Sequence, residues 1–232
     1  MEFSLLGEPS QLAASMRSIY TVLGENPREA FRTSGLSSFY KEEYAREESA
    51  PRRAKAFFET PGNLAVAIKA GESAVGVATF WREVPLKRTE RLKEKARNKI
   101  AKLVGKIGCS GLQERLYRPA VWNMASFVLS LATNDKTNYT QQILEPVLAT
   151  ALPKLRDMGA EVLQFGVTDT VQANKPPLIS PEDAVAGQTT GTEFNIGDLK
   201  FIKGKKQAGE IHHDGTTEVN TTNWRASIPQ VA

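Results

Sequence analysis

The stretch AVWNMASFVLSLATNDKTNYTQQILEPVLATALPKL, residues 120–155, contains the signals for a strand, a turn and a helix in that order. Residues 120–133 are rich in β-branched and aromatic side chains, which favours a buried strand. Residues 143–155 place apolar side chains at helical spacing, and the turn between them, 134–140, is polar. Many α/β proteins bind a phosphate at such a turn, because the first amides of the helix point at the anion. This turn has no glycine, although glycine normally lets the backbone come close to an anion.

Two prolines lie within the helical pattern after the turn, Pro146 and Pro153. A proline inside a helix removes a hydrogen bond and clashes with the preceding turn, at a cost of about 3 kcal/mol. The sequence therefore predicts either a bent helix or a helix that begins just before Pro146.

Further strands are predicted on both sides of this unit. Residues 2–6 and 160–170 have apolar strand patterns. Residues 64–69 and 74–81 predict a hairpin, in which Gly71 supplies the positive φ of a tight turn. Residues 192–204 predict a closing pair of short strands or one bent strand.

The bulk composition is that of an ordinary globular protein, with 232 residues, 41% hydrophobic and 24% charged. The single cysteine, Cys109, cannot form a disulfide within the chain. No segment reaches the roughly 18 apolar residues of a membrane-spanning helix, and the N-terminus does not have the pattern of a signal peptide. We therefore predict a cytoplasmic protein without a membrane span.

The positive charge is concentrated in one segment. Residues 82–118 carry twelve Lys or Arg and four Glu, a balance of +8, so the rest of the chain sums to −4. Within it, residues 87–107 predict a helix whose apolar stripe runs from Leu92 to Ile107. One interpretation is a surface helix docked through this stripe, with a solvated basic side. The other is a lid or clamp over an anionic substrate, a cofactor or a membrane surface.

The chain after residue 170 has weaker patterns. Residues 205–232 are polar and threonine-rich, and predict a C-terminal tail that lies on the body or is partly disordered.

The order of these elements resembles that of the GNAT superfamily of acyl-CoA-dependent N-acetyltransferases, especially its divergent fungal-type members. The phrases AVAIKAGESAVGVATFW, residues 65–81, and LPKLRDMGAEVLQFGV, residues 152–167, carry the resemblance. It implies a single domain over residues 1–204 of the α/β (α+β) class: a mixed, mostly antiparallel, twisted sheet flanked by helices, with 82–118 as a basic helical insertion. The central strand, 121–133, should then lie beside 161–168.

The resemblance also implies a binding site for acetyl-CoA or another acyl-CoA as co-substrate. In the family, the amides of the turn after the central strand hold the CoA pyrophosphate. The residues assigned to the acyl-CoA on this basis are Leu131, Thr133, Lys136, Thr137, Asn138, Tyr139, Thr140 and Gln141. Tyr139 and Gln141 replace two small residues of the family motif. If the tyrosine points outward, the amides stay usable; otherwise the cradle is lost or repurposed.

The same resemblance suggests residues for the acceptor and the chemistry. Trp81 and Asn123 lie on strands that flank the acceptor site in the family, although core packing is an alternative for the tryptophan. Asp169, at the end of a strand, fits a general base for an amine or a turn-forming aspartate. The tyrosine that often serves as general acid in the family has no counterpart between Asp169 and Phe194.

Other reactive residues offer little. His212 and His213 are adjacent, so their side chains point apart on a strand and suit no common metal spacing. Cys109 has no histidine nearby in the sequence to activate it. We therefore expect no metal and no nucleic-acid partner, while the oligomeric state stays open.

The functional hypothesis is an N-acyltransferase that acetylates a small-molecule amine. The alternative is a GNAT-fold protein that no longer transfers acyl groups and acts as a small-molecule binding or scaffold protein, or catalyses another reaction.

Overall fold

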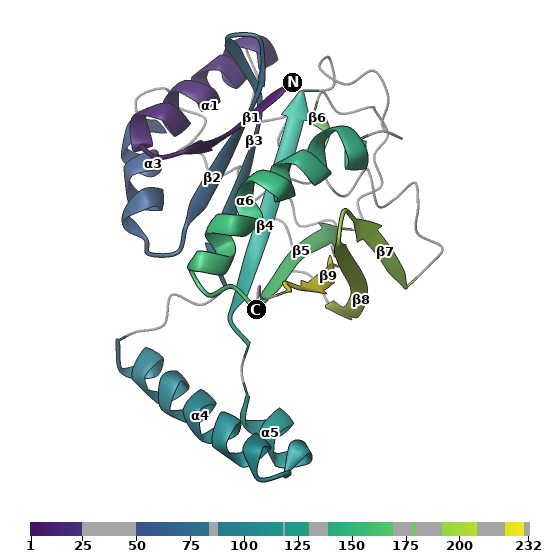
Figure 1. Ribbon diagram of the computed structural model, residues 1–232. Coiled ribbons are helices and arrows are strands. Elements are labelled where there is room, and N and C mark those ends of the chain that lie inside the picture. Colours follow the sequence, from purple (N-terminus) through teal and green to yellow (C-terminus); the bar gives the residue numbers. More distant parts are fainter. Residues whose placement is uncertain are drawn as a thin grey trace, which may run out of the picture.

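A single sheet lies at the centre of the molecule, and the described part of the chain contributes nine strands to it (Figure 1). The computed structural model describes residues 1–24, 50–83, 88–117, 119–129, 139–168, 178–179, 192–207 and 221–229. Eight strands run in the order β1-β2-β3-β4-β5-β9-β8-β7, and β6 pairs with β4. Their bounds are β1 Glu2–Leu6, β2 Leu64–Ala70, β3 Ser73–Arg82, β4 Val121–Leu129, β5 Val162–Thr168, β6 Leu178–Ile179, β7 Glu193–Ile196, β8 Leu199–Gln207 and β9 Thr221–Ser227.

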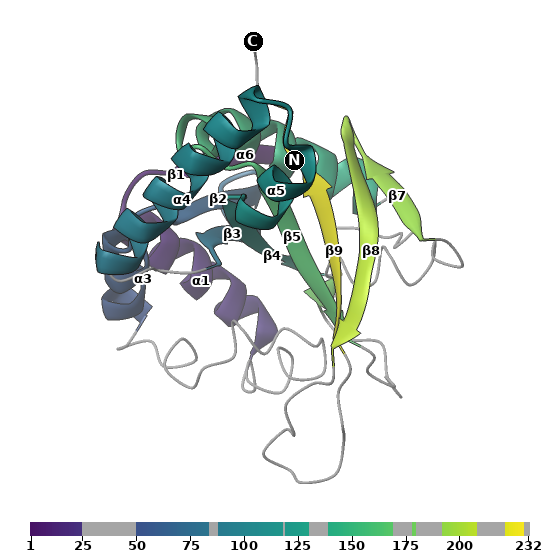
Figure 2. The same ribbon diagram turned by 90° about the horizontal axis from the view of Figure 1, so that it is seen from below.

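Helices cover both faces of this sheet. Helix α6 lies on one face, and α1 and α3 lie on the other (Figures 1 and 2). The helices are α1 Pro9–Leu23, α3 Ala50–Glu59, α4 Arg88–Lys106, α5 Ser110–Leu116 and α6 Glu145–Asp157, and the π-helix η3 spans Thr140–Leu144. All pairs except β4 with β5 are antiparallel, so the predicted fold class is confirmed.

Strand β4 divides the core between the two faces. Its Trp122, Met124 and Val128 side chains join the core under α6, and Phe127 and Leu129 join the core under α1. Alternation with a period of two produces this division. The predicted position of the central strand beside the strand from 161 is confirmed, since Val121–Asn123 pair in parallel with Val162–Gln164.

The β2–β3 hairpin is also confirmed, with Gly71 at φ 62° in its turn. Gly76 is needed for a different reason. A Cβ at this position would lie 2.5 Å from the carbonyl oxygen of Phe127, so β3 and β4 can approach as they do only without a side chain here.

The helix after β4 shows how the chain accommodates Pro146. The α-helical part begins at Glu145, just before the proline, but the backbone is already helical in the π-turn that precedes it. In front of it, η3 is one wider turn, closed by a bond from the Glu145 amide to the Thr140 carbonyl. Proline fits the first turn of a helix because its missing amide would have no helical partner there.

The predicted polar tail is wrong in part. Residues 205–207 belong to β8, and β9 lies inside the sheet between β5 and β8. Thr222, Trp224 and Ala226 of β9 are buried, so every second side chain of this strand faces the core under α6. This period of two is the signature of a strand packed on one face.

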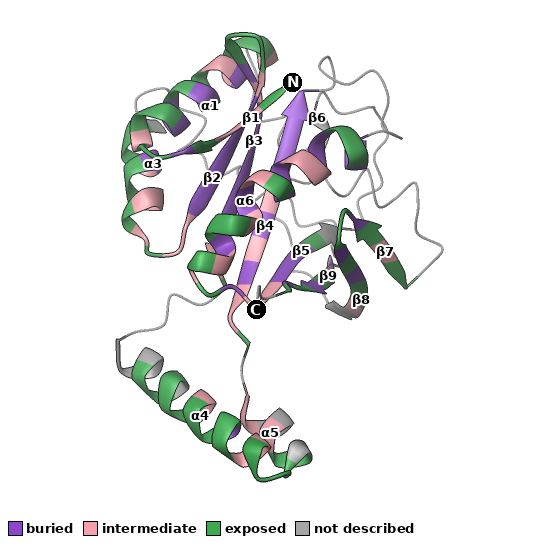
Figure 3. Ribbon diagram, in the orientation of Figure 1, coloured by how far each residue is buried: buried purple, intermediate pink, exposed green. Residues whose placement is uncertain are grey.

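The predicted docking of the basic helix through its apolar stripe is also wrong. Helix α4 is present, but Leu92, Ile100, Leu103 and Ile107 are 61%, 52%, 55% and 75% exposed. Figure 3 shows α4 and α5 as a largely exposed hairpin beside the body, between β3 and β4 in the chain.

Candidate functional site

Strands β4 and β5 separate after a short parallel contact. Their ladder ends at Asn123 and Gln164, and further along β4 only Val128 and Leu129 pair with the short β6. Among the described residues, the edge of β4 from Met124 to Phe127 that faces β5 therefore has no strand partner. An unpaired backbone edge inside a sheet can bind an extended ligand that carries amide groups.

A row of polar side chains crosses the sheet where the two strands separate. Gln164, 3% exposed, donates its amide hydrogens to Asn123 Oδ1 at 2.8 Å and to Glu83 Oε1 at 3.0 Å. Its carbonyl oxygen accepts a hydrogen bond from Arg225 Nε at 2.6 Å. Arg225 Nη2 lies 3.9 Å from Glu83 Oε1, which adds an ion pair between half-exposed side chains. We call Asn123, Gln164, Glu83 and Arg225 the polar row.

The polar row faces the same side of the sheet as α1 and α3. Asn123 alternates with Trp122 and Met124, which belong to the core under α6, so it points the opposite way. Two predicted site residues come together here, because Trp81 and Asn123 are directly paired between β3 and β4. Trp81 is partly exposed, whereas Trp122 is buried and donates to the Gly62 carbonyl at 2.7 Å.

Sequence reasoning missed the other three members of the polar row. The signal in the sequence was Gln164, a single polar residue within the apolar run of β5. Glu83 and Arg225 come from segments far from it in the chain, and only the sheet register brings them together.

The predicted phosphate-binding turn is described only from Tyr139 onward. The side chain of Tyr139 is fully buried, and its hydroxyl lies 2.9 Å from the hydroxyl of Ser126. Of the two alternatives for this side chain, the structure therefore has the one in which it does not point outward. Thr140 is buried as well, while Gln141 is exposed. Leu131, Thr133, Lys136, Thr137, Asn138 and Asp169 lie outside the described residues.

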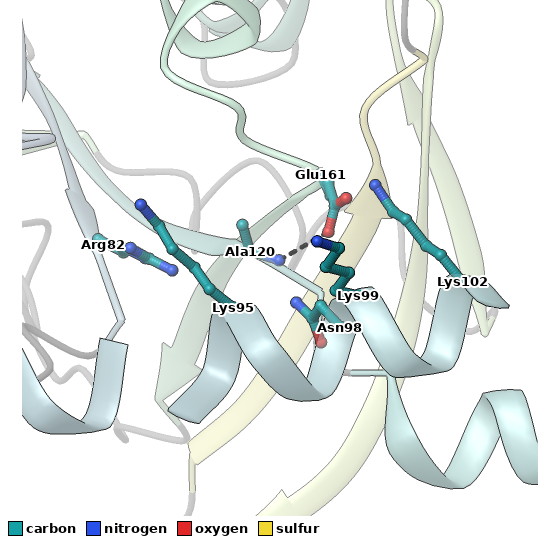
Figure 4. Close-up of a pocket in the computed structure, with 7 residues that line it drawn as sticks. All are labelled: Arg82, Lys95, Asn98, Lys99, Lys102, Ala120 and Glu161. Carbon is teal, nitrogen blue, oxygen red and sulfur yellow. Dashed lines mark hydrogen bonds between the residues drawn. The ribbon is translucent and has the colours of Figure 1, made fainter. Parts of the chain in front are cut away.

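A pocket of about 360 Å³ lies between α4 and the body (Figure 4). It is lined by Arg82, Lys95, Asn98, Lys99, Lys102, Ala120 and Glu161. Arg82, Ala120 and Glu161 lie where β3 ends and where β4 and β5 begin, and the other four residues lie on α4. The turn follows the other end of β4. The hypothesis that α4 closes over phosphates bound at that turn is therefore wrong, because α4 lies at the opposite end of β4.

Glu161 connects the segment between α5 and β4 to the start of β5. Its carboxylate accepts hydrogen bonds from the Tyr117 hydroxyl and, at 2.9 Å, from the Ala120 amide. Burial raises the pKa of Tyr117 well above its ordinary value, and the hydrogen bond and the charge of Glu161 raise it further. The protonated phenol therefore acts as a fixed donor to this carboxylate.

The remaining reactive residues are Cys109, His212 and His213. Cys109 is exposed between α4 and α5. The described part of the chain has no group of three or more His, Cys, Asp or Glu that could hold a metal. His212 and His213 lie outside that part.

Comparisons with known proteins agree with this geometry. No protein-family model matches the chain, and no curated protein matches it significantly. Solved structures match over nearly its whole length. An N-acetyltransferase from Staphylococcus aureus Mu50 is 8% identical, with a TM-score of 0.52 over 99% of this chain and 100% of that one. A GNAT-family acetyltransferase from Streptococcus pneumoniae is 11% identical, with a TM-score of 0.50 over 98% and 100%.

A third similar structure was solved with a ligand. This protein of Salmonella typhimurium, described as an acetyltransferase in complex with its cofactor acetyl-CoA, is 8% identical, with a TM-score of 0.50 over 99% of this chain and 96% of that one. The strand order, the separation of β4 from β5 and these matches lead to one conclusion: the chain has the fold of the GNAT-family N-acetyltransferases.

Proposed function

We propose that the protein is an acyltransferase that moves the acyl group of an acyl-CoA, with acetyl-CoA the first candidate, to the amine of a small molecule. The observation that carries this proposal is the position of the polar row. It lies at the point where β4 and β5 separate, so a polar binding surface meets an unpaired strand edge.

The described residues fit an acyl-CoA at this place. The amide-containing arm of CoA suits the open edge of β4 at Met124–Phe127, which offers backbone donors and acceptors. Its pyrophosphate suits the amides at the start of the helix, near Tyr139, where the helix dipole favours an anion. We propose Leu131, Thr133, Lys136, Thr137, Asn138 and the backbone of Tyr139, Thr140 and Gln141 for this role.

The acceptor is proposed to bind on the polar row. The carboxylate of Glu83 can attract an ammonium group, and Asn123 and Trp81 border the same surface. In the reaction, the bound ammonium first loses one proton to water. The neutral amine nitrogen then attacks the thioester carbon, the carbon–sulfur bond breaks, and the nitrogen loses its second proton. Asp169 is proposed to accept this proton, and water to protonate the leaving thiolate. A backbone amide of the open β4 edge would polarise the carbonyl.

One observation favours a second candidate function. Tyr139 places a bulky buried side chain where the family has a small residue, and this can close the cradle. The protein would then bind a small molecule or act as a scaffold without acyl transfer, or catalyse another reaction. A cytoplasmic location and a fungal-type relationship stay predictions.

Calorimetry with acetyl-CoA and CoA, followed by a thiol-release assay with a panel of small amines, tests the proposal. We expect saturable acetyl-CoA binding and amine-dependent release of CoA. Asn123→Ala and Glu83→Gln should raise the KM for the amine with little change in acetyl-CoA binding, and Lys154→Gln, on the outer side of α6, should change neither. No heat with about 1 mM acetyl-CoA, where even binding of about −4 kcal/mol is detectable, would favour the second candidate.

A further inference from the structure

The hairpin of α4 and α5 carries an apolar surface that the described body does not cover. Leu92, Ile100, Leu103 and Ile107 of α4 are all more than half exposed, and Leu112 of α5 is 50% exposed. We call these five residues the outer stripe. Several large apolar side chains exposed along one helical hairpin are a feature of interaction sites.

The four α4 residues of the outer stripe are not turned toward α5. The contact between the two helices uses the other side of α4, where Ala101 is fully buried. A Cβ at Gly105 would overlap the side chain of Gln113, so α4 and α5 are already in close contact there. With 100° per residue, Ala101 lies about 140° away from the centre of the outer stripe. The hairpin is therefore packed internally and still presents apolar side chains to its surroundings.

Positive charge borders the outer stripe on both sides. Helix α4 carries eight Lys or Arg and two Glu, a net charge of +6. At 100° per residue, Lys93 and Arg97 fall on one side, and Lys95, Lys99, Lys102 and Lys106 fall on the other. Of the second group, Lys95, Lys99 and Lys102 also line the pocket toward the body (Figure 4), whereas Lys106 does not. No described carboxylate lies within ion-pair distance of these five lysines. Glu161, the one acidic residue of the neighbouring pocket, already accepts two hydrogen bonds.

The combination of charge and apolar surface selects the partner. A second copy of this chain would bring two helices of net charge +6 together, and their repulsion opposes that contact. A nucleic acid would use the lysines and leave the outer stripe in water. An anionic lipid surface uses both, because apolar side chains enter the boundary of the acyl chains while lysines extend to the phosphates.

We propose that the α4–α5 hairpin is a membrane-contact element that lies in the plane of an anionic lipid surface. The helix would rest on the surface, since none of the described helices is long and apolar enough to cross a membrane. This contact does not rest on the acyl-transfer proposal, because the outer stripe and its flanking lysines include no residue of the polar row or of the turn after β4.

The native Cys109 provides a reporter for this proposal. It is the chain's single cysteine, and it is exposed between the two helices. An environment-sensitive dye on Cys109 should shift to the blue with vesicles of phosphatidylcholine containing about one third phosphatidylserine, and stay unchanged with phosphatidylcholine alone. Raising the salt from about 0.1 to 0.5 M should weaken binding, because the Debye length shortens.

Variants separate the apolar and the charged contributions, with vesicle flotation of the whole protein as the readout. Leu103→Glu with Ile107→Glu should lower the partition coefficient at least tenfold. Lys93→Gln with Lys106→Gln, at two exposed positions that do not line the pocket, should lower it about 25-fold, since each basic residue near an anionic surface contributes about fivefold. Ile202→Ser and Lys154→Gln, exposed positions on β8 and α6, are matched controls that should leave binding unchanged.

Far-UV circular dichroism and the Tm check that each variant is folded. The proposal is overturned if the wild-type protein does not distinguish anionic from neutral vesicles, or if folded outer-stripe variants bind as well as the parent. A dimer in light scattering that Leu103→Glu converts to a monomer would overturn it in favour of a second copy. A higher affinity for DNA or RNA, unchanged by Leu103→Glu, would overturn it in favour of nucleic acid.

Discussion

Strand β4 and helix α4 both place apolar side chains on a regular face, but they bury them to opposite extents. Phe127 and Val128 of β4 are fully buried. Leu103 and Ile107 of α4 are 55% and 75% exposed. Both patterns satisfy the rule for an amphipathic element, so the pattern alone does not distinguish them.

The difference shows that a periodic apolar face indicates side chains that tend to be buried. It does not indicate whether the same chain or a partner buries them. For β4 the cover comes from the same chain, since α6 and α1 lie on its two faces. For α4 the described part of the chain supplies a neighbour only for the side around Ala101. Large-to-small substitutions should therefore lower the free energy of unfolding when they are made in β4. In α4 they should instead weaken binding to a partner surface.

The largest expected effect compares Phe127→Ala with Leu103→Ala. The first leaves a cavity in the core and should lower the free energy of unfolding by about 4 kcal/mol. The second removes a mostly exposed side chain and should change it by less than about 0.5 kcal/mol. Urea unfolding followed by circular dichroism measures both. A loss above about 1.5 kcal/mol for Leu103→Ala would mean that the outer stripe is covered by the chain itself.

A second pair of substitutions uses glycines. Gly76→Ala should destabilise the protein by about 3 kcal/mol, because the new Cβ would lie 2.5 Å from the Phe127 carbonyl oxygen and the strands would have to move apart. Gly111→Ala in α5 has open space around it and should stabilise the hairpin by up to about 1 kcal/mol. Equal Tm shifts for the two variants would show that β3 and β4 can move apart at Gly76 without a loss of stability.

A smaller effect is expected from the buried hydroxyl pair of β4. Tyr139→Phe leaves the Ser126 hydroxyl without this partner and should cost about 1 to 2 kcal/mol. Ser126→Ala should cost a similar amount. If the two hydroxyls act as a pair, the double variant should lose less than the sum of the single variants. Strict additivity in this cycle would show that the hydrogen bond contributes nothing.

The smallest effect concerns the connection of the hairpin to the sheet. The raised pKa of Tyr117 means that folding favours the neutral phenol, chiefly because of burial. This contribution to stability is full below the ordinary tyrosine pKa of about 10 and is lost as the pH rises above it. The Tm of the wild-type protein should therefore fall more steeply above pH 10 than that of Tyr117→Phe. Parallel Tm curves from pH 9 to 11 would contradict this.

The sequence could predict the elements whose patterns are local. The β2–β3 hairpin needed only two apolar runs and Gly71, and β4 needed only its β-branched and aromatic residues. Strand β9 was missed although its alternation of buried and exposed residues was readable from Thr222 to Ile228. Its polar residues, Asn223, Arg225 and Ser227, and the threonine-rich segment in front of it have the composition of a polar tail.

The candidate site could be predicted less well, because it depends on register. Trp81 and Asn123 were named from their strands, and the structure pairs them. The contacts of Gln164 with Glu83 and Arg225 join segments 81 and 61 residues apart, and a shift of one residue in either pairing would turn a side chain to the other face. The direction of the α4 stripe could not be predicted either, since it depends on which neighbours the helix meets.

The position of β9 inside the sheet has a consequence for synthesis of the protein. Strand β5 pairs with β4 over three residue pairs and with β9 over seven, so β9 is its main partner. On the ribosome, the chain from Thr168 to Ser227 takes roughly 3 to 12 s to make at about 5 to 20 residues per second. During that interval β5 has a bare edge, which other nascent chains can join. Chaperones that shield strand edges should therefore raise the yield of this protein most when translation is slowed between these two strands.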